Sequence, residues 1–344
     1  MLRRLRDWWY FRQAVQDASR VELTHPAGER DVVVLPCWRR PEFLWHCLDN
    51  LTRADGVDSV HLLFRPDTGF SADNLDVIRS FSDRLSSFEI QLADPCPFRR
   101  TKPSANFLLG LLHAAAMTRR LVFLVEEDIM VARDFFRWHR AVHAAADPLF
   151  CSIPVKNPNR VLSLPDDPAA YYLSSGDSCS NGMCFDKHVL QSLVAPHVNM
   201  AYLRQPKKYI RRNFPASTIG LGYVEQDGLI RRIQERSPLP IAWPCVPRAF
   251  HSGFFGARGG WHNFTHPAGD GQSIEQRVQL LTDTIYDADA MLEAVVRNSG
   301  ERAEFIASCM PCSLTPPPWT VLHRIDVPPP GAAGAASAPS ALAS

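Results

Sequence analysis

The sequence predicts an α/β protein in which helices flank a mostly parallel sheet. Residues 121–125 (LVFLV) are apolar at every position, as in a central strand that helices cover on both faces. Two more apolar runs, residues 31–35 and 60–64, precede it, and segments with apolar residues at helical spacing lie between them. The chain of 344 residues is 46% hydrophobic, so it can fill a substantial core in one continuous domain.

The first half of the chain alternates strands with helices. Residues 31–35 (DVVVL) are the first expected strand, and a turn containing proline leads from it into a helix with its apolar positions between residues 43 and 51. Residues 60–64 are the second strand, which ends at an Arg-Pro-Asp turn, and residues 88–92 are the third. This alternation is typical of a parallel sheet.

A further helix and strand complete this half. Apolar positions between residues 108 and 115 indicate a helix, which leads into the strand at residues 121–125. Asp134 can cap the next helix, whose apolar positions Phe135, Trp138 and Val142 lie on one side. Three acids therefore fall in a loop at the carboxyl end of a central strand, where ligands bind in such sheets.

The chain divides into four stretches. Residues 1–30 form an N-terminal helical segment, residues 31–150 the first half of the domain and residues 151–312 the second half, where turns and glycines are more frequent. Residues 313–344 are rich in Pro, Ala, Gly and Ser, so we expect this tail to be disordered. No internal repeat is present.

Charge and cysteine content exclude several classes of protein. The formal net charge is +1, from 37 Lys and Arg against 36 Asp and Glu, so no global field attracts nucleic acid. Nine scattered cysteines in a chain of this size indicate reduced thiols. No apolar run of about twenty residues and no signal-peptide pattern occur, so we expect a soluble, cytoplasmic protein.

Two basic segments are candidates for contact with a membrane. Residues 1–13 combine Arg3, Arg4 and Arg6 with four aromatic residues, which is typical of a helix that rests on an anionic bilayer; the alternative is a packing helix. Residues 202–212 are densely basic. They can meet an anionic acceptor, a lipid diphosphate or only solvent. The hypothesis that follows from the first reading of each segment is peripheral contact at the inner face of the membrane.

The acidic triplet Glu126-Glu127-Asp128 is the central candidate for chemistry. Three adjacent carboxylates at the end of a buried strand repel one another unless a cation or water relieves them. Mg²⁺ and Mn²⁺ take one or two protein carboxylates and complete their shell with water and phosphate oxygens. The alternative is a solvated acidic turn or the start of a helix.

Several segments resemble N-acetylglucosaminyltransferase I-type enzymes: DVVVLPCWRRPEFLWHCLD, FRRTKPSANFLLGLLHAA and LVFLVEEDIMVARDFF. The resemblance spans roughly residues 31–265 and implies the GT-A (Rossmann-like) fold of an inverting glycosyltransferase. In that family the last acid of an EDD triplet ligates Mn²⁺ on the UDP diphosphate, which implies Asp128 as the ligand, with Mn²⁺ or Mg²⁺ bound. Glu126 matches the family, and Glu127 stands where the family has Asp.

The same match implies the nucleotide site. Pro36, Cys37 and Arg39 would lie against the nucleotide, and Asp67 takes the place of an acid near the uracil; the alternative for Asp67 is a turn residue. Nucleotide contacts are also implied at two positions on the next helix, Lys102 and Asn106, and the latter stands where the family has His. Glu126 and Glu127 complete the implied donor-side set.

The second half carries the implied catalytic acid. YVEQDGLIRR and CVPRAFHSGFFGARGG resemble family segments, and Asp227 matches the base that deprotonates the acceptor hydroxyl, with Glu225 as a nearby rival. The pair can equally cap a helix. His251 can be a second metal ligand, a phosphate ligand or a structural residue. Arg248 beside it can close over the leaving diphosphate or serve only at the surface.

The resemblance thus implies a metal-dependent enzyme that moves a sugar from a UDP-sugar donor to a glycan or glycolipid acceptor. Residues 31–150 would bind the nucleotide sugar and residues 151–312 would shape the acceptor side. The family donor is UDP-N-acetylglucosamine. Three alternatives stay open: a retaining transferase, a non-catalytic nucleotide-sugar or glycan-binding protein, and a metal-dependent nucleotidyltransferase or phosphohydrolase.

Overall fold

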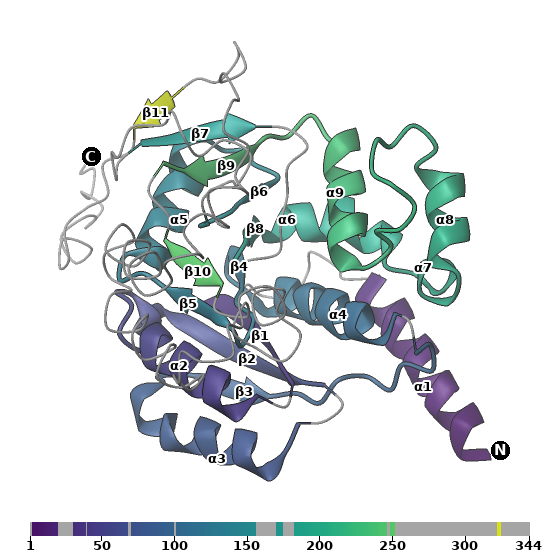
Figure 1. The fold of residues 1–344 in the computed structure, drawn as a ribbon, viewed down its shortest axis with the longest axis horizontal. Helices are drawn as coiled ribbons and strands as arrows, with labels where there is room; N and C mark the ends of the chain where they lie inside the picture. Colours follow the sequence, from purple (N-terminus) through teal and green to yellow (C-terminus); the bar gives the residue numbers. More distant parts are fainter. Residues whose placement is uncertain are drawn as a thin grey trace, which may run out of the picture.

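The protein is a mixed α/β structure built on one large sheet (Figure 1). The computed structural model describes residues 2–19, 30–38, 40–67, 70–99, 101–155, 170–174, 182–245, 248–251 and 322–324. Within these residues the sheet has nine strands in the order β11-β7-β9-β6-β8-β4-β1-β2-β3, and β10 pairs with β5 in a separate two-stranded sheet. The predicted α/β class with helices flanking the sheet is confirmed.

The parallel part of the sheet comes from the first half of the chain. β1 (Asp31–Cys37) pairs in parallel with β2 (Val60–Pro66) and β4 (Leu121–Leu124), and β2 pairs in parallel with β3 (Phe88–Ile90). All four strands were predicted from the sequence, although β3 ends before Leu92, whose side chain is exposed. Their carboxyl ends therefore meet at one edge of the sheet.

The second half of the chain extends the same sheet mainly through antiparallel pairs. Its strands are β6 (Cys151–Ser152), β7 (Ala170–Ser174), β8 (Cys184–Asp186), β9 (Ile241–Pro244) and β11 (Leu322–Arg324). β8 joins the two halves because it is antiparallel to β4 and to β6, whereas β6 and β9 are parallel. β7 is antiparallel to β9 and β11.

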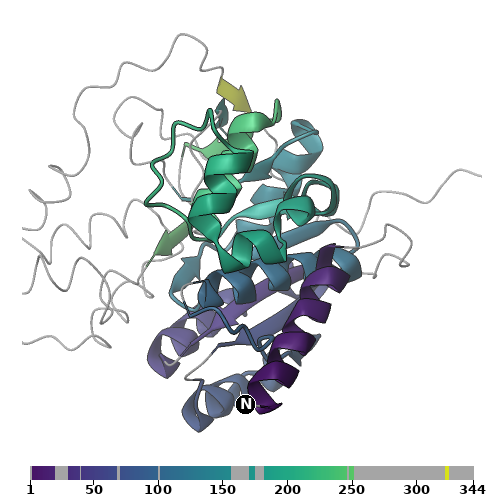
Figure 2. The same cartoon turned by 90° about the vertical axis from the view of Figure 1, so that its right-hand side faces the viewer.

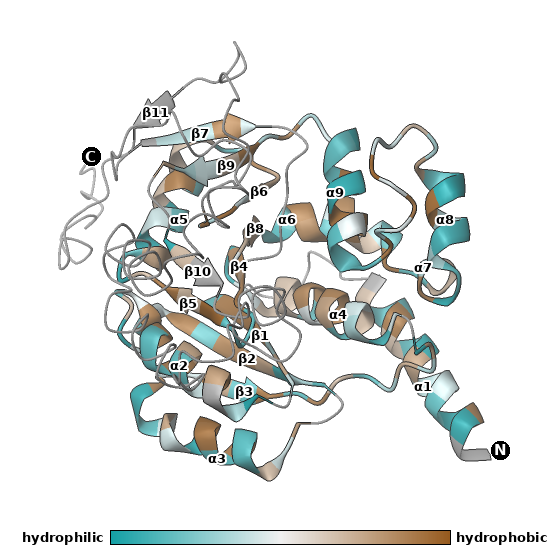
Figure 3. Ribbon diagram, in the orientation of Figure 1, coloured by the Kyte–Doolittle hydropathy of each residue, from teal (hydrophilic) through white to brown (hydrophobic). Residues whose placement is uncertain are grey.

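Two hydrophobic cores lie on opposite faces of the sheet because successive side chains of β1 point to opposite sides. Val33 and Leu35 pack with α2 (Pro41–Leu51), α3 (Ala72–Ser80) and α5 (Phe135–Ala145). Val32 and Val34 pack with α1 (Leu2–Ser19), α4 (Lys102–Met117) and α9 (Gln226–Arg236). Figure 3 shows the apolar character of α4, which is buried along most of its length.

The remaining helices are short and connect the larger elements. They are η1 (Val57–Ser59), η2 (Ser82–Arg84), α6 (Lys187–Val189), η3 (Leu190–Val194), η4 (Ala195–His197), α7 (Met200–Arg204) and α8 (Pro206–Asn213). α7 and α8 lie beside α9 and above α1 in Figure 2. None of the helices that the structure describes combines the length and apolar character needed to cross a bilayer.

Candidate active site

The acidic triplet lies directly after β4, at the edge where the parallel strands end. Val125 N–H donates to Val34 O (3.0 Å), which carries the pairing with β1 one residue beyond the strand. The chain then turns through Glu126-Glu127-Asp128 into β5 (Ile129–Val131). Glu127 and Asp128 are 1% and 5% exposed, so this is a buried pair of carboxylates rather than a solvated acidic turn.

Arg40 holds this buried pair. Its Nε lies 2.6 Å from Glu127 Oε1, and its Nη1 lies 2.7 Å from Asp128 Oδ2. The guanidinium also stacks over the ring of Phe43, with 5.3 Å between Cζ and the ring centroid. Arg40 occupies the N-cap position of α2, so the first turn of that helix fixes the clamp.

Burial and charge act in opposite directions on these groups. Burial raises the pKa of Glu127 and the neighbouring Asp128 adds to the increase, while Arg40 and the Trp38 N–H oppose it. Burial tends to lower the pKa of Arg40, but the carboxylates of Asp128 and Glu127 raise it above its ordinary value. The arrangement therefore favours a charged guanidinium between two acids.

Glu127 anchors the loop between β1 and α2. Its Oε2 accepts a hydrogen bond from Trp38 N–H (2.7 Å), and its Oε1 accepts from Arg40 Nε. Both oxygens thus serve the loop that follows β1. The described contacts give the Glu127 side chain a positioning role, and its contact with a nucleotide sugar stays a prediction. Glu126 is half-buried, and its carbonyl accepts from Ile129 N–H (2.9 Å) within the turn.

A second strand brings His251 to the acidic turn. β10 (Ala249–His251) is antiparallel to β5, and His251 is paired with Ile129, the residue after Asp128. Among the side chains that the structure describes, no group of three His, Cys, Asp or Glu forms a metal site. Mg²⁺ and Mn²⁺ take one or two protein carboxylates and complete their shell with water and phosphate, so the buried carboxylate of Asp128 is chemically suited to the predicted cation, and the role of His251 stays a prediction.

The ends of β1 and β2 lie side by side at the same edge. Asp67 N–H donates to Cys37 O (2.8 Å), and Pro36 pairs with Arg65 in the parallel register. The thiol of Cys37 is buried and donates to Leu35 O, so Cys37 presents backbone rather than side chain. Asp67 is half-buried beside it. Arg39 lies outside the described residues.

Lys102 and Asn106 differ in what they can contact. Lys102 is half-buried in the first turn of α4. Asn106 is 4% exposed, and both ends of its amide serve Arg65: Oδ1 accepts from Nε (3.1 Å) and Nδ2 donates to the carbonyl (3.2 Å). Arg65 in turn donates to Gln91 and Asp94. The predicted nucleotide contact of Asn106 remains untested, and its observed role is to position Arg65.

Asp227 lies in the first turn of α9, with Glu225 at the N-cap position. The Glu225 side chain does not form the predicted cap of this helix; its Oε2 accepts from Val224 N–H instead (3.0 Å). The helix begins against α4, because Ser104 Oγ donates to Gln226 Oε1 (2.8 Å) and accepts from Gln226 N–H (3.2 Å). Asp227 is thus tied to the end of α4 that carries Lys102.

The topology puts this end of α4 near the acidic triplet. α4 connects β3 to β4, and both strands are parallel to the rest of the first half, so α4 runs back and begins at their carboxyl edge. Asp128 follows β4 at that edge. The structure therefore locates Asp128, Lys102 and Asp227 at one edge of the sheet.

The loop before α9 is held by a buried arginine. Arg232 Nη1 donates to Gly228 O (2.7 Å) and Tyr223 O (2.5 Å), and Nη2 donates to two further carbonyls of the same loop, Ile219 O and Gly220 O. A Cβ at Gly228 would lie 2.3 Å from Tyr223 O. Only glycine permits this approach, which fixes the turn that carries Asp227.

Several positioning residues were not predicted from the sequence. Arg40 and Ser104 contact distant segments, and Arg232 contacts backbone carbonyls of the loop just before it, so no sequence pattern marks them, although Arg40 lies in the resembling segment CWRRPEF. Arg248 was expected near a leaving diphosphate or at the surface. It is 3% exposed, and its Nε pairs with Asp134 Oδ2 (3.2 Å). Asp134 consequently stands at the N-cap of α5 without capping it through its side chain.

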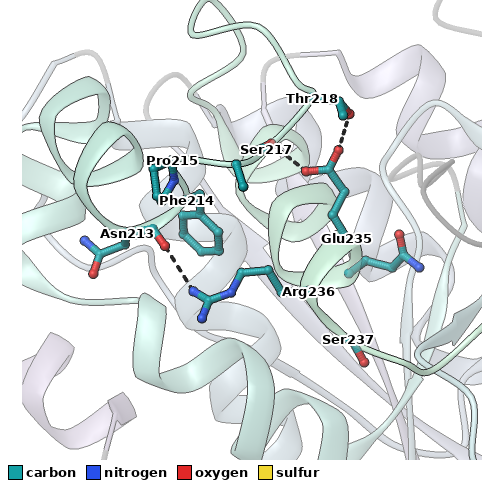
Figure 4. A pocket seen from close by; sticks show the side chains of 10 residues that line it. Asn213, Phe214, Pro215, Ser217, Thr218, Glu235, Arg236 and Ser237 are labelled. Atoms are coloured by element: carbon teal, nitrogen blue, oxygen red, sulfur yellow. Dashed lines mark hydrogen bonds between the residues drawn. The ribbon is translucent and has the colours of Figure 1, made fainter.

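A separate groove lies at the opposite end of α9 (Figure 4). It has a volume of about 510 Å³ and is lined by residues 213–218 and 234–237. Its polar groups are engaged within the groove, since Glu235 accepts from Ser217 and Thr218 and Arg236 donates to Asn213 O. Asp227 lies in the first turn of α9, whereas this groove lies at the last turn. The groove is therefore not part of the candidate site.

Comparison with known proteins gives distant structural likenesses. No family model matches the chain, and no curated protein matches it in sequence. The mannosyltransferase PcManGT from Pyrobaculum calidifontis, in complex with GDP-Man and Mn²⁺, shares 16% identity over 88% of this chain and 87% of that one, with a TM-score of 0.37.

Two further solved structures are similar at the same level. TarS of S. aureus, in complex with UDP-GlcNAc, shares 10% identity over 82% of this chain and 89% of that one, with a TM-score of 0.39. Mouse xyloside xylosyltransferase 1 shares 11% identity over 61% and 83%, with a TM-score of 0.40. TM-scores this low indicate only distant likenesses.

Proposed function

We propose that the chain is a metal-dependent inverting glycosyltransferase with a GT-A-like fold. The observation that supports this most strongly is the buried acid Asp128 at the carboxyl edge of a parallel sheet, with the strand of His251 paired beside it. A carboxylate and an imidazole at this edge can hold a divalent cation against a diphosphate. Residues 31–150 form the donor half in this proposal, and residues 151–312 form the acceptor half.

The donor is a nucleotide sugar, for which the resemblance suggests UDP and N-acetylglucosamine. The backbone of Pro36 and Cys37 and the half-buried carboxylate of Asp67 lie together where β1 and β2 end. These groups can accept hydrogen bonds from a base and a ribose. Lys102, in the first turn of α4, can add a positive charge for the diphosphate.

The divalent cation would be held by Asp128 and His251. When bound, it would neutralise the negative charge that develops on the departing nucleoside diphosphate. Arg40 pairs with Asp128 through one guanidinium nitrogen and with Glu127 through another, so Arg40 can release Asp128 and still be held by Glu127. Glu127 thus keeps the loop after β1 in place with or without the cation.

Asp227 is the proposed base. An inverting transfer needs one carboxylate that takes the proton of the acceptor hydroxyl while that hydroxyl attacks the anomeric carbon. Asp227 lies in a turn fixed by Gly228, Arg232 and the contact between Ser104 and Gln226. Glu225 is exposed whereas Asp227 is half-buried, and the Glu225 carboxylate accepts from the Val224 N–H. We therefore assign the role to Asp227 before Glu225.

The acceptor is a glycan or a glycolipid. A glycolipid would present its sugar at a membrane surface, so peripheral contact with a membrane belongs to the proposal. The second candidate function is a non-catalytic nucleotide-sugar-binding protein. It is favoured by the ion pair between Arg40 and Asp128, which engages the proposed metal ligand directly.

Calorimetric titration tests the donor site. UDP and UDP-N-acetylglucosamine would be titrated with and without Mn²⁺ into the wild type, into Asp128→Ala and into Asp76→Ala. Asp76 is an exposed carboxylate on α3 paired with Arg79, so it is the matched control. We expect binding that requires both Mn²⁺ and Asp128 and that Asp76→Ala leaves unchanged. Failure of other nucleotide sugars as well as UDP ligands to bind would remove the basis of the proposal.

Product analysis separates the remaining alternatives. If the donor binds, incubation with candidate acceptors followed by NMR of the anomeric proton gives the stereochemistry of the product. Inversion supports the role of Asp227, whereas retention requires a carboxylate on the donor face of the anomeric carbon. Tight donor binding with no transfer to any glycan or glycolipid would favour the binding protein.

A further inference from the structure

One face of the molecule combines the N-terminal helix with helices from the second half of the chain. α1 packs against α4 and η4, and His197 of η4 makes a hydrogen bond through Nδ1 with Tyr209 Oη of α8 (2.9 Å). This side lies on the right in Figure 1 and faces the viewer in Figure 2. We call the surface formed by α1, α7 and α8 the α1–α8 face.

The charge of this face differs from that of the whole chain. Residues 187–224 contain six Lys or Arg and no Asp or Glu, in a chain whose net charge is only +1. Five of the six cations are exposed on α7 and α8: Arg204, Lys207, Lys208, Arg211 and Arg212. Among the described residues, no carboxylate forms an ion pair with any of these five.

The fold of α8 turns these cations outward. Pro206 and Ile210 are buried on the inner side of the helix, which leaves the basic side chains on the outer side. Arg204, Lys208 and Arg212 line a groove of about 440 Å³ together with Tyr209 and other residues of α7 and α8. Lys208 and Arg212 are four residues apart on α8, so they lie on one side of that helix. The face therefore offers a continuous positive surface.

α1, the other helix of this face, has exposed apolar and aromatic side chains. Phe11 and Val15 are buried in the core, whereas Leu5, Trp9 and Tyr10 are 55%, 56% and 54% exposed. The rings of Trp9 and Tyr10 meet edge to face at 5.3 Å. Further exposed cations on this helix are Arg4, Arg6 and Arg12. Exposed tryptophan, tyrosine and arginine on one helix are typical of a helix that lies at a bilayer surface.

We propose that the α1–α8 face docks on an anionic lipid bilayer, with Leu5, Trp9 and Tyr10 among the headgroups and the cations of α8 against lipid phosphates. Charge complementarity supports the bilayer, since basic residues are attracted to an anionic leaflet. The exposed apolar side chains favour it over a soluble polyanion, which would gain nothing from Leu5. The assignment specifies the surface that makes the membrane contact in the proposed function. Binding of this face to a bilayer requires neither the sugar donor nor the acceptor.

Vesicle co-sedimentation of the full chain tests the assignment. The wild type would be mixed with vesicles of phosphatidylcholine alone and with vesicles in which a third of the lipid is phosphatidylglycerol, at low and at physiological salt. We expect binding only to the anionic vesicles, weakened by salt. Lys208→Gln with Arg212→Gln should lower the partition coefficient roughly thirtyfold, and Trp9→Ser with Tyr10→Ser roughly tenfold or more.

A charge-matched control distinguishes the face from the net charge. Arg79→Gln with Arg133→Gln removes the same two charges from side chains that are 69% and 64% exposed, on α3 and before α5, far from α1 and α8 in Figure 1. This variant should bind like the wild type. Thermal melts would show that all variants fold, since the changed residues are exposed.

Two results with vesicles would overturn the assignment: no binding of the wild type to anionic vesicles at low salt, or a loss of binding in the control variant as large as in the α8 variant. A third result would be tighter binding of the wild type to heparin than to vesicles, seen when a low concentration of heparin displaces the protein from the vesicles. The last outcome would identify a soluble polyanion as the partner. Each of these results leaves the donor titration with Asp128 unaffected, so the two proposals fail separately.

Discussion

Arg40 Nη1 lies 2.7 Å from Asp128 Oδ2, so a guanidinium holds the carboxylate that we propose as a metal ligand. The same side chain binds Glu127, which is almost fully buried and also accepts from the backbone of Trp38. A divalent cation at Asp128 must therefore compete with Arg40. This competition makes the metal affinity depend on a residue that need not touch the metal.

Arg40→Gln should tighten Mn²⁺ binding and weaken the fold. Removing the competing positive charge should increase the affinity for Mn²⁺ by at least about tenfold. Without the guanidinium of Arg40, the buried carboxylates of Glu127 and Asp128 lose their partner, and the free energy of unfolding should fall by roughly 2–4 kcal/mol. Calorimetry and urea unfolding in EDTA measure the two effects. Arg84→Gln, which removes a half-exposed partner of Asp49, is the control. Weaker Mn²⁺ binding in Arg40→Gln would contradict the competition.

Asp227→Asn should abolish transfer while donor binding remains. The amide cannot take the acceptor proton, and loss of a general base typically lowers kcat by about 10²- to 10⁴-fold. Glu225→Gln removes the neighbouring exposed carboxylate and should keep most of the activity. Steady-state kinetics with a competent acceptor, together with calorimetry of the donor, check both variants. Loss of activity in Glu225→Gln alone would transfer the base to Glu225.

Gly228→Ala should disturb the turn that carries Asp227. The new Cβ would lie 2.3 Å from Tyr223 O, a contact that backbone atoms cannot relieve without moving. We expect a loss of roughly 1–3 kcal/mol in the free energy of unfolding and a reduced kcat. Gly222→Ala is the matched control, because no atom lies within 4 Å of its Cβ. Equal stability of the two variants in urea unfolding would show that the turn adapts.

Asn106→Ala separates a nucleotide contact from a structural role. Its amide binds both the guanidinium and the carbonyl of Arg65, which is itself 1% exposed. Loss of these partners should lower the free energy of unfolding by about 1–3 kcal/mol. If the role is structural, the UDP affinity of the folded variant should change little. A large loss of UDP affinity without loss of stability would instead support the contact that the resemblance implies.

The free energy of unfolding should decrease as the pH falls from 6.5 to about 4, because His143 is buried in the folded protein. This side chain is fully buried on α5, and burial lowers its pKa to about 4 from 6.5. Between these values the unfolded chain binds the proton more readily, so stability is complete above pH 6.5 and decreases as the pH falls toward 4. The contribution amounts to roughly 3 kcal/mol in all.

Urea unfolding from pH 7 to pH 4.5 tests this window in two variants. His143→Gln should flatten the fall in stability, although it also loses the contact of Nε2 with Cys184 O. His188→Gln changes an exposed histidine and should keep the slope of the wild type. An unchanged slope in His143→Gln would assign the acid sensitivity to other groups.

The sequence by itself determined the parallel half of the fold. Strands β1, β2 and β4 contain short runs of buried Val, Leu and Phe. Such runs can bury the apolar side chains of both faces only between two layers of helices. The position of Asp128 followed from the same pattern, because an acidic loop after a central strand lies at the carboxyl edge. Local periodicity and the order of residues contain this information.

Only the tertiary structure decided which groups meet at that edge. The clamp of Arg40 on Glu127 and Asp128 joins segments 87 residues apart, and the contact of Ser104 with Gln226 joins segments 122 residues apart. The second half of the sheet is built from strands of two to five residues, too short to show a period. The partners of Asn106 and Arg248 within the protein, Arg65 and Asp134, could not be read from the sequence, because a buried polar side chain takes whichever partner the packing brings within reach.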